Sequence, residues 1–171
     1  MSKKRGALKT LGAHRAGRGG RHVFDLYRLR RVPAGGKSGT KSHYANTRAT
    51  VLEGERIQVG LAFEKAGCGA RPYTHPNEQF NFVVKGTLMA DIAGKKTMRV
   101  PAGSVVYFPA NVVHRTYATP EEDVVFYVVK DLSYGIAGRP VDQSRGGAHR
   151  VSRTPLGAKV KRGGRAKHRP A

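Results

Sequence analysis

The chain has 171 residues, enough for one domain with extensions, and a formal net charge of +21. It contains no apolar stretch long enough to span a bilayer, and no apolar run follows the basic start as in a secretory signal. The single cysteine, Cys68, excludes an internal disulfide and fits a reducing compartment. From these features together we expect a cytoplasmic protein that does not enter a membrane.

The positive charge is concentrated at the two ends of the chain. Residues 1–48 carry a net +12 and residues 139–171 a net +9, whereas residues 49–138 carry both signs equally. Both ends are rich in Gly and lack hydrophobic periodicity, so they cannot bury enough apolar surface to offset the entropy of ordering. We therefore predict flexible basic tails over 1–21 and 143–171 and a folded domain over 22–142.

Short runs rich in β-branched and aromatic residues, separated by Gly and Pro, fill the middle of the chain. They predict an outer strand at 22–32 and further strands at 56–64, 79–85, 87–92, 96–100, 104–108, 112–118 and 123–130. Because the strands are short and no amphipathic helix is evident, we predict an all-β sandwich or barrel. The small core also favours a homodimer, paired through an edge strand or a sheet face.

The apolar residues of these strands are expected to form the core and the wall of a pocket for a small-molecule ligand. They are Phe80, Phe82, Val84, Val106, Phe108, Val125 and Tyr127. Phe82 and Phe108 are assigned to the substrate pocket itself.

Two segments combine turn glycines with side chains that bind metals. The segment GCGARPYTHPNEQFNFVVKG at 67–86 contains His75 and Gln79, and GSVVYFPANVVH at 103–114 ends at His114. If their strands are neighbours in a barrel, these three side chains point together into its mouth. Glu78 adjoins Gln79 in sequence and should point to the opposite face of a regular strand.

The two segments resemble the paired signature of the cupin superfamily, G-x5-H-x-H-x3-E-x6-G and G-x5-P-x-G-x2-H. The residues in register are Gly67, His75 and Gly86 in the first motif and Gly103, Pro109 and His114 in the second. The match covers roughly residues 55–131, and HPNEQFNFVVKGTL is similar to single-domain cupins of the pectin-degradation-protein type. The resemblance implies a double-stranded β-helix, or jelly-roll, barrel.

In metal-bearing cupins the histidines and the Glu or Gln of these motifs hold a divalent transition metal. Carried over, the resemblance assigns His75, Gln79 and His114 as ligands of Fe, Mn, Ni, Cu or Zn. Tyr73 stands where the family has its first His, and Gln79 where it usually has Glu. Two imidazoles and an amide oxygen make an uncharged site, which suits these metals better than Mg or Ca.

Several roles around this site stay open. Tyr73 could line the pocket, serve as a general acid or base, or coordinate a metal as a phenolate, and Gln79 could be a ligand or a hydrogen-bonded strand residue. Arg71 and Arg115 flank the site in sequence and could anchor an acidic substrate or remain solvated. The pair His43-Tyr44 could cap the pocket from a partner chain.

The resemblance implies a small metal-dependent enzyme that acts on a polar or carboxylated metabolite, by dioxygenase, isomerase or lyase chemistry. One alternative is a metal-free small-molecule-binding or regulatory cupin. Another is a nucleic-acid-associated protein whose basic tails bind phosphate weakly, without sequence preference and in a salt-dependent way.

Overall fold

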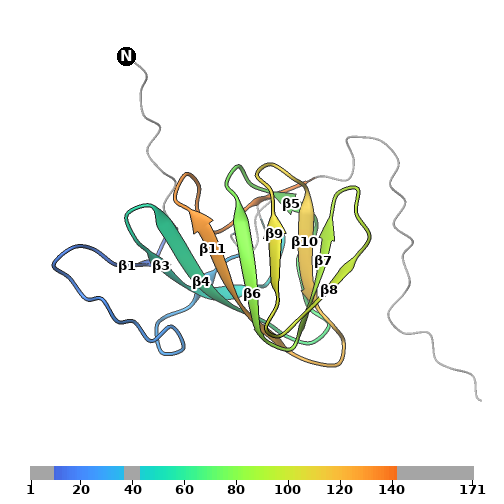
Figure 1. Cartoon of the computed structure of the whole chain (residues 1–171), viewed down its shortest axis with the longest axis horizontal. Helices are drawn as coiled ribbons and strands as arrows, with labels where there is room; N and C mark the ends of the chain where they lie inside the picture. Colours follow the sequence, from blue (N-terminus) through green and yellow to red (C-terminus); the bar gives the residue numbers. More distant parts are fainter. Residues whose placement is uncertain (1–9, 37–42, 142–171) are drawn as a thin grey trace, which may run out of the picture.

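The structure, a computed structural model, describes residues 10–36 and 43–141, and the strands of that part form two facing sheets (Figure 1). The strands are β1 His14–Arg15, β2 Val32–Pro33, β3 Arg48–Glu53, β4 Ile57–Glu64, β5 Tyr73–Thr74, β6 Gln79–Lys85, β7 Thr87–Ile92, β8 Met98–Pro101, β9 Val105–Phe108, β10 His114–Ala118, β11 Val124–Asp131 and β12 Arg139–Pro140. Within the described residues no helix is long and apolar enough to cross a bilayer.

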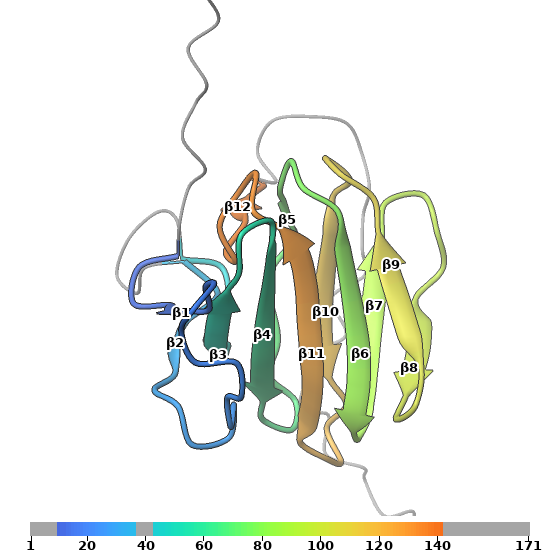
Figure 2. The same ribbon diagram turned by 60° about the vertical axis from the view of Figure 1, so that its left-hand side comes forward.

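The larger sheet has the order β1-β3-β4-β11-β6-β9, with β2 beside β3, and the smaller has the order β12-β5-β10-β7-β8. β1 pairs with β3 in parallel, and the other pairs are antiparallel. Figure 2 shows β4, β11, β6 and β9 side by side. Two antiparallel sheets enclosing one core confirm the predicted all-β jelly-roll barrel.

The side chains of each strand alternate between the barrel interior and its outer surface. On β6, Gln79 and Asn81 are buried inside, whereas Phe80 and Phe82 are 42% and 49% exposed on the outside. The prediction that Phe80, Phe82 and Val84 form the core or the pocket wall is therefore wrong, and it is wrong for Val125 and Tyr127 of β11 for the same reason. Other apolar residues fill the core, among them Leu88, Ala90, Val106, Phe108, Val124 and Phe126.

The folded part of the chain begins earlier than predicted. β1 pairs with the end of β3, and the amide of Thr10 donates to the buried carboxylate of Glu53 at 2.7 Å. Arg15 also contacts this carboxylate, at 3.5 Å. The expected flexible tail is thus wrong for residues 10–21, because Glu53 needs these donors. The remaining tail residues, 1–9 and 143–171, lie outside the described part, as does residue 142 of the predicted domain.

Residues 22–31 cover part of the outer face of the larger sheet instead of forming the predicted strand. The ring of Tyr27 meets Phe63 of β4 edge-on at 6.0 Å, and the guanidinium of Arg31 lies 3.6 Å from the Phe63 ring centre. The neighbouring strands β11, β6 and β9 have no such cover within the described residues. The exposed or half-buried side chains there are Phe80, Phe82, Val84, Val105, Tyr107, Val125, Tyr127 and Val129.

Candidate functional site

The turn between β5 and β6 and the start of β10 bring the motif residues together. Tyr73 is the register partner of His114, and Gln79 is the partner of Phe108 on β9. His75 lies in the turn, and its ring centre is 4.8 Å from that of His114, with the two planes at 81°. The topology therefore gathers Tyr73, His75, Gln79 and His114 inside one end of the barrel.

Both histidines are fixed by backbone carbonyls. His75 Nδ1 is 2.8 Å from the Asn77 carbonyl oxygen, and His114 Nδ1 is 2.8 Å from that of Val112. A carbonyl oxygen only accepts, so each Nδ1 carries the ring hydrogen and each Nε2 presents a bare lone pair. His75 Nε2 is 3.0 Å from Gln79 Oε1, and His114 Nε2 is buried without a hydrogen-bond partner among the described residues.

Burial keeps the two imidazoles neutral. It lowers the pKa of His75 to about 3, with smaller contributions from the charges of Lys130 and His114. Burial likewise lowers the pKa of His114 to about 4, and the charge of Lys130 acts in the same direction. Neutral imidazole is the form that binds metals.

The donor atoms fit a softer divalent metal, although the set is small. Gln79 Nε2 donates to Asn81 Oδ1 at 2.9 Å and so turns its amide oxygen toward His75 Nε2, and the ring of His114 lies 4.8 Å from that of His75. Within the described residues no three His, Cys, Asp or Glu side chains come together as a metal-binding group. A metal would therefore depend on Gln79 in the place of a carboxylate.

Tyr73 lies against His114 and closes the site from the side of the barrel mouth. Its ring centre is 4.4 Å from that of His114 and 4.3 Å from that of Tyr44, which stacks on it at 27°. Burial raises the pKa of Tyr73 well above its ordinary value, while hydrogen bonds to Thr116 and Gln79 act the other way. Its hydroxyl group therefore carries a proton at neutral pH.

The mouth of the barrel is covered by the same chain. The Tyr44 hydroxyl donates to the Ala34 carbonyl at 3.0 Å and accepts from the Gly138 amide at 2.7 Å. β12, which begins directly after Gly138, pairs with β5. A Cβ added at Gly138 would lie 2.6 Å from the Tyr73 ring, so the chain passes close over that ring. Tyr44 is thus a cap, but the expectation that a partner chain supplies it is wrong for this structure.

Three of the four predicted pocket residues lie away from the interior. Phe82 is on the outer face, Arg71 is exposed and donates to the His43 carbonyl, and Arg115 forms an ion pair with Asp91 at 2.6 Å. Their assignment to the pocket is therefore wrong. Strand alternation turns Phe82 outward, and the two arginines are held by partners outside the interior. Phe108 is fully buried, with its ring 4.5 Å from that of His114.

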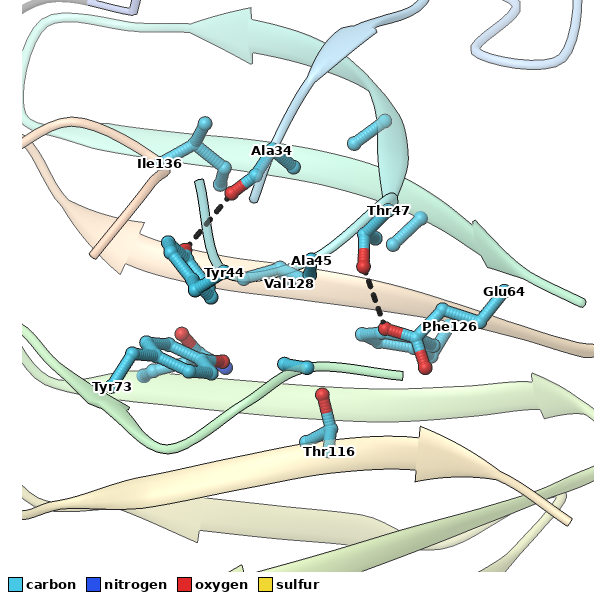
Figure 3. Close-up of a pocket in the computed structure, with 14 residues that line it drawn as sticks. Ala34, Tyr44, Ala45, Thr47, Glu64, Tyr73, Thr116, Phe126, Val128 and Ile136 are labelled. Atoms are coloured by element: carbon cyan, nitrogen blue, oxygen red, sulfur yellow. Dashed lines mark hydrogen bonds between the residues drawn. The ribbon is translucent and has the colours of Figure 1, made fainter. Parts of the chain in front are cut away.

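A small cavity of about 40 Å³ continues from Tyr73 and Gln79 along the barrel (Figure 3). Its lining residues are Ala34, Tyr44, Ala45, Thr47, Ala49, Ala62, Glu64, Ala70, Tyr73, Gln79, Thr116, Phe126, Val128 and Ile136. Many of them are alanines, so the cavity exists because small side chains occupy inward positions.

Sequence reasoning missed two buried charged residues, Glu64 and Lys130. Thr47 Oγ1 donates to Glu64 Oε1 at 2.9 Å, and burial raises the pKa of Glu64 to about 8. Lys130 Nζ donates to the Ile136 carbonyl at 2.8 Å, and burial lowers its pKa to about 7. Glu64 could have been found from the alternation of β4, since it has the same inward parity as Ala62.

This fold and buried site define a small jelly-roll barrel, and the comparisons place it in a family. A cupin domain model matches residues 59–130. Similar solved structures include a cupin-like protein from Thermotoga maritima, at 24% identity and a TM-score of 0.50, over 62% of this chain and 80% of that one. Residues 59–130 are therefore identified as a cupin domain.

Two other similar structures come from different organisms. The Cnp3 cupin domain of Schizosaccharomyces pombe shares 13% identity at a TM-score of 0.52, over 64% of this chain and 73% of that one. KdgF from Halomonas sp. shares 17% identity at a TM-score of 0.46, over 50% of this chain and 80% of that one. At these identities the similarity concerns the fold alone. No curated protein matches the sequence significantly.

Proposed function

We propose that this cupin binds a divalent transition metal through His75, Gln79 and His114 and is an enzyme acting on a small polar or carboxylated metabolite. The observation that carries the proposal is the pair of imidazoles, each held by a carbonyl so that a bare, buried Nε2 points inward. Among the described residues neither imidazole lone pair has a donor, and a cation held by the two lone pairs and the facing amide oxygen would satisfy them.

When bound, Fe, Mn, Ni, Cu or Zn would polarise an oxygen of the substrate. The chain's own residues hold and shield that position. Asn77 and Val112 fix the imidazoles through their carbonyls, and Phe108 packs against His114. Tyr73, protonated at neutral pH and packed against His114, is placed to donate a proton. This assignment fits dioxygenase, isomerase or lyase chemistry.

The metal is tested by elemental analysis of the untagged full-length chain, purified without chelator. We expect about one transition-metal ion per chain, lost in a His75→Ala/His114→Ala variant. A matched His22→Ala/His43→Ala variant, altered at one exposed and one half-buried histidine, should keep it. Absence of metal from the parent chain, even after reconstitution with Fe, Mn, Ni, Cu and Zn, would overturn the proposal.

A metal-free binding cupin is the second candidate, and the Lys130 ammonium favours it. Its charge lowers the pKa of both site histidines, and the same field would oppose a metal cation. If the amides of Gln79 and Asn81 are reversed, Gln79 donates to His75 Nε2 and no cation is needed there. Stabilisation by a metabolite that is unaffected by chelator would support this candidate.

We also propose that two copies pair through the uncovered outer face of β11, β6 and β9. Its side chains, from Phe80 to Val129, are apolar or aromatic and carry no charge. The excess positive charge lies at the two ends of the chain, so two copies can meet on this face without opposing like charges on it.

The net charge of +21 further supports weak, non-specific binding of nucleic acid by the ends of the chain. A chain restricted to residues 10–141 should bind single-stranded DNA more weakly and with a shallower salt dependence. Equal binding by the two chains would place the interaction on the folded domain.

A further inference from the structure

Glu64 and Thr47 form a thin wall between the interior cavity and the surface. Both residues line the cavity of about 40 Å³, and both also line an outer pocket of about 330 Å³. The other residues of that outer pocket are Asn46, Phe63, Lys65, Gly67, Cys68 and Gly69. The two spaces therefore meet at one pair of side chains.

This wall is held less firmly than the cap over the mouth. At the mouth, the Tyr44 hydroxyl makes two hydrogen bonds, its ring stacks on Tyr73, and β12 pairs with β5. At the wall, the side chains are joined by one hydrogen bond, from Thr47 Oγ1 to Glu64 Oε1 at 2.9 Å. Rotation of Thr47 breaks that bond without disturbing the backbone.

The carboxyl group also has unused hydrogen-bonding capacity. Glu64 is only 5% exposed, and its Oε2 is buried without a partner among the described residues. Figure 3 shows the carboxyl group among the side chains that line the cavity, joined to Thr47 by the hydrogen bond. A buried carboxyl oxygen without a partner is costly, so the site is suited to a ligand that supplies one.

We propose that the outer pocket binds a small neutral molecule with an amide or other carbonyl group, and that this group passes Thr47 and pairs with Glu64 inside the barrel. The inner cavity is a few times larger than the roughly 10–15 Å³ that one water needs, so it admits only the polar end. The outer pocket holds the rest. Tyr73 and Gln79 of the histidine site also line the cavity, but the pairing with Glu64 does not depend on a metal.

The protonation of Glu64 supports a neutral ligand at neutral pH. Burial raises its pKa to about 8, so Oε2 carries a proton that a carbonyl oxygen can accept. The other titratable groups around it are Tyr44 and Tyr73 toward the cavity and Lys65 and Cys68 in the outer pocket. Burial raises the pKa of both tyrosines, so neither loses its proton at neutral pH.

Three probes of the same planar shape test the proposal: acetamide, acetate and acetamidinium, which are neutral, anionic and cationic. Each is titrated into full-length protein labelled with ¹³C at alanine methyl groups. The signals of Ala49 and Ala62 report on the cavity, and that of Ala118, buried elsewhere in the core, is the internal control.

At about pH 6.5 we expect saturable shifts of Ala49 and Ala62 with acetamide, and binding of acetate about tenfold weaker or less. At about pH 9.5 ionised Glu64 should favour acetamidinium over acetamide. Glu64→Gln should abolish this reversal, whereas Glu55→Gln, at a side chain 58% exposed, should retain it. Equal binding of the three probes, no saturable binding, or a reversal that survives Glu64→Gln would overturn the proposal.

The entrance is tested separately at Cys68. This residue is exposed and is the only cysteine, so N-ethylmaleimide modifies it alone. Modification should block the acetamide shifts at Ala49 and Ala62, whereas Cys68→Ser should bind as the parent does. Unchanged shifts after modification would mean that the probe enters elsewhere, and the proposed entrance would be wrong.

Discussion

Glu64, His75 and His114 are buried titratable side chains that change stability in opposite directions as the pH rises. The folded-state pKa of Glu64 is raised from 4.5 to about 8, so its stabilising effect is complete below about pH 4.5 and is lost as the pH rises through about 8. The pKa values of His75 and His114 are lowered to about 3 and about 4 in the folded protein. As the pH falls below about 6.5 these histidines take up protons in the unfolded chain first, and this lowers the stability of the folded protein.

The contribution of Glu64 appears as a difference between the parent chain and Glu64→Gln. We expect the free energy of unfolding of the parent, minus that of the variant, to fall by on the order of 3 kcal/mol between about pH 5 and pH 8. Urea unfolding at several pH values measures it, and the histidine contribution cancels. A difference that stays constant with pH would show that Glu64 titrates normally.

Lys130 is the residue whose charge most directly opposes a metal at the histidines. Since burial lowers the pKa of Lys130 to about 7, Lys130→Met removes a full charge at about pH 6 while keeping the length of the side chain, and we expect metal affinity there to rise by about tenfold. Competition with a colorimetric chelator measures the change, and the exposed Lys65→Met is the matched control. Equal affinities in parent and Lys130→Met would show that the ammonium does not act on the site.

At the scale of elements, the turn between β6 and β7 is set by Gly86. Its φ is +75°, and an added Cβ would overlap the backbone oxygen of Asp123 before β11. Gly86→Ala should lower the free energy of unfolding by about 2 kcal/mol or more, from both effects. Gly94 has the same φ with nothing near its Cβ position, so Gly94→Ala should cost only about 1 kcal/mol. Equal losses of stability in the two variants would show that the contact with Asp123 does not destabilise Gly86→Ala.

At the scale of the whole molecule, the uncovered outer sheet face predicts self-association. Phe82 is 49% exposed near its middle, and Phe82→Lys should shift the parent from dimer to monomer in light scattering over a range of concentrations. Val23→Lys adds the same charge at an 80% exposed residue of the 22–31 segment and should leave the dimer intact. A parent that is monomeric at every concentration would contradict the prediction.

The fold could be predicted from the turn residues, because the backbone conformation that a turn needs depends only on its own few residues. Gly67, Gly86 and Gly103 all have positive φ, so the spacing of glycines records where the chain must turn. Which face of a strand turns inward is less local. From the sequence, Gln79, Phe80 and Phe82 are all expected to point inward. On one regular strand Gln79 and the two phenylalanines must point to opposite faces, and Gln79 is the residue that is buried.

Features that depend on distant partners could not be predicted. The composition of residues 10–21 is that of a solvated tail, yet Thr10 and Arg15 both contact the carboxylate of Glu53 on β3. The alternation of β4 indicates that Glu64 points inward, but the cavity beside it is lined from several strands, and the sequence does not show that these strands meet there. The metal ligands stay a prediction, because spacing fixes the positions of His75 and His114 but not what they hold.

β11 occupies the middle of the larger sheet, between β4 and β6, although it is made near the end of the chain. A growing polypeptide therefore exposes the apolar edges of β4 and β6 until residues 124–131 have been synthesised. Because these contacts are distant in sequence, assembly should be slow and all-or-none. A nascent chain that stops before β11 would have two unpaired strand edges, so early termination should yield aggregates rather than a smaller folded protein.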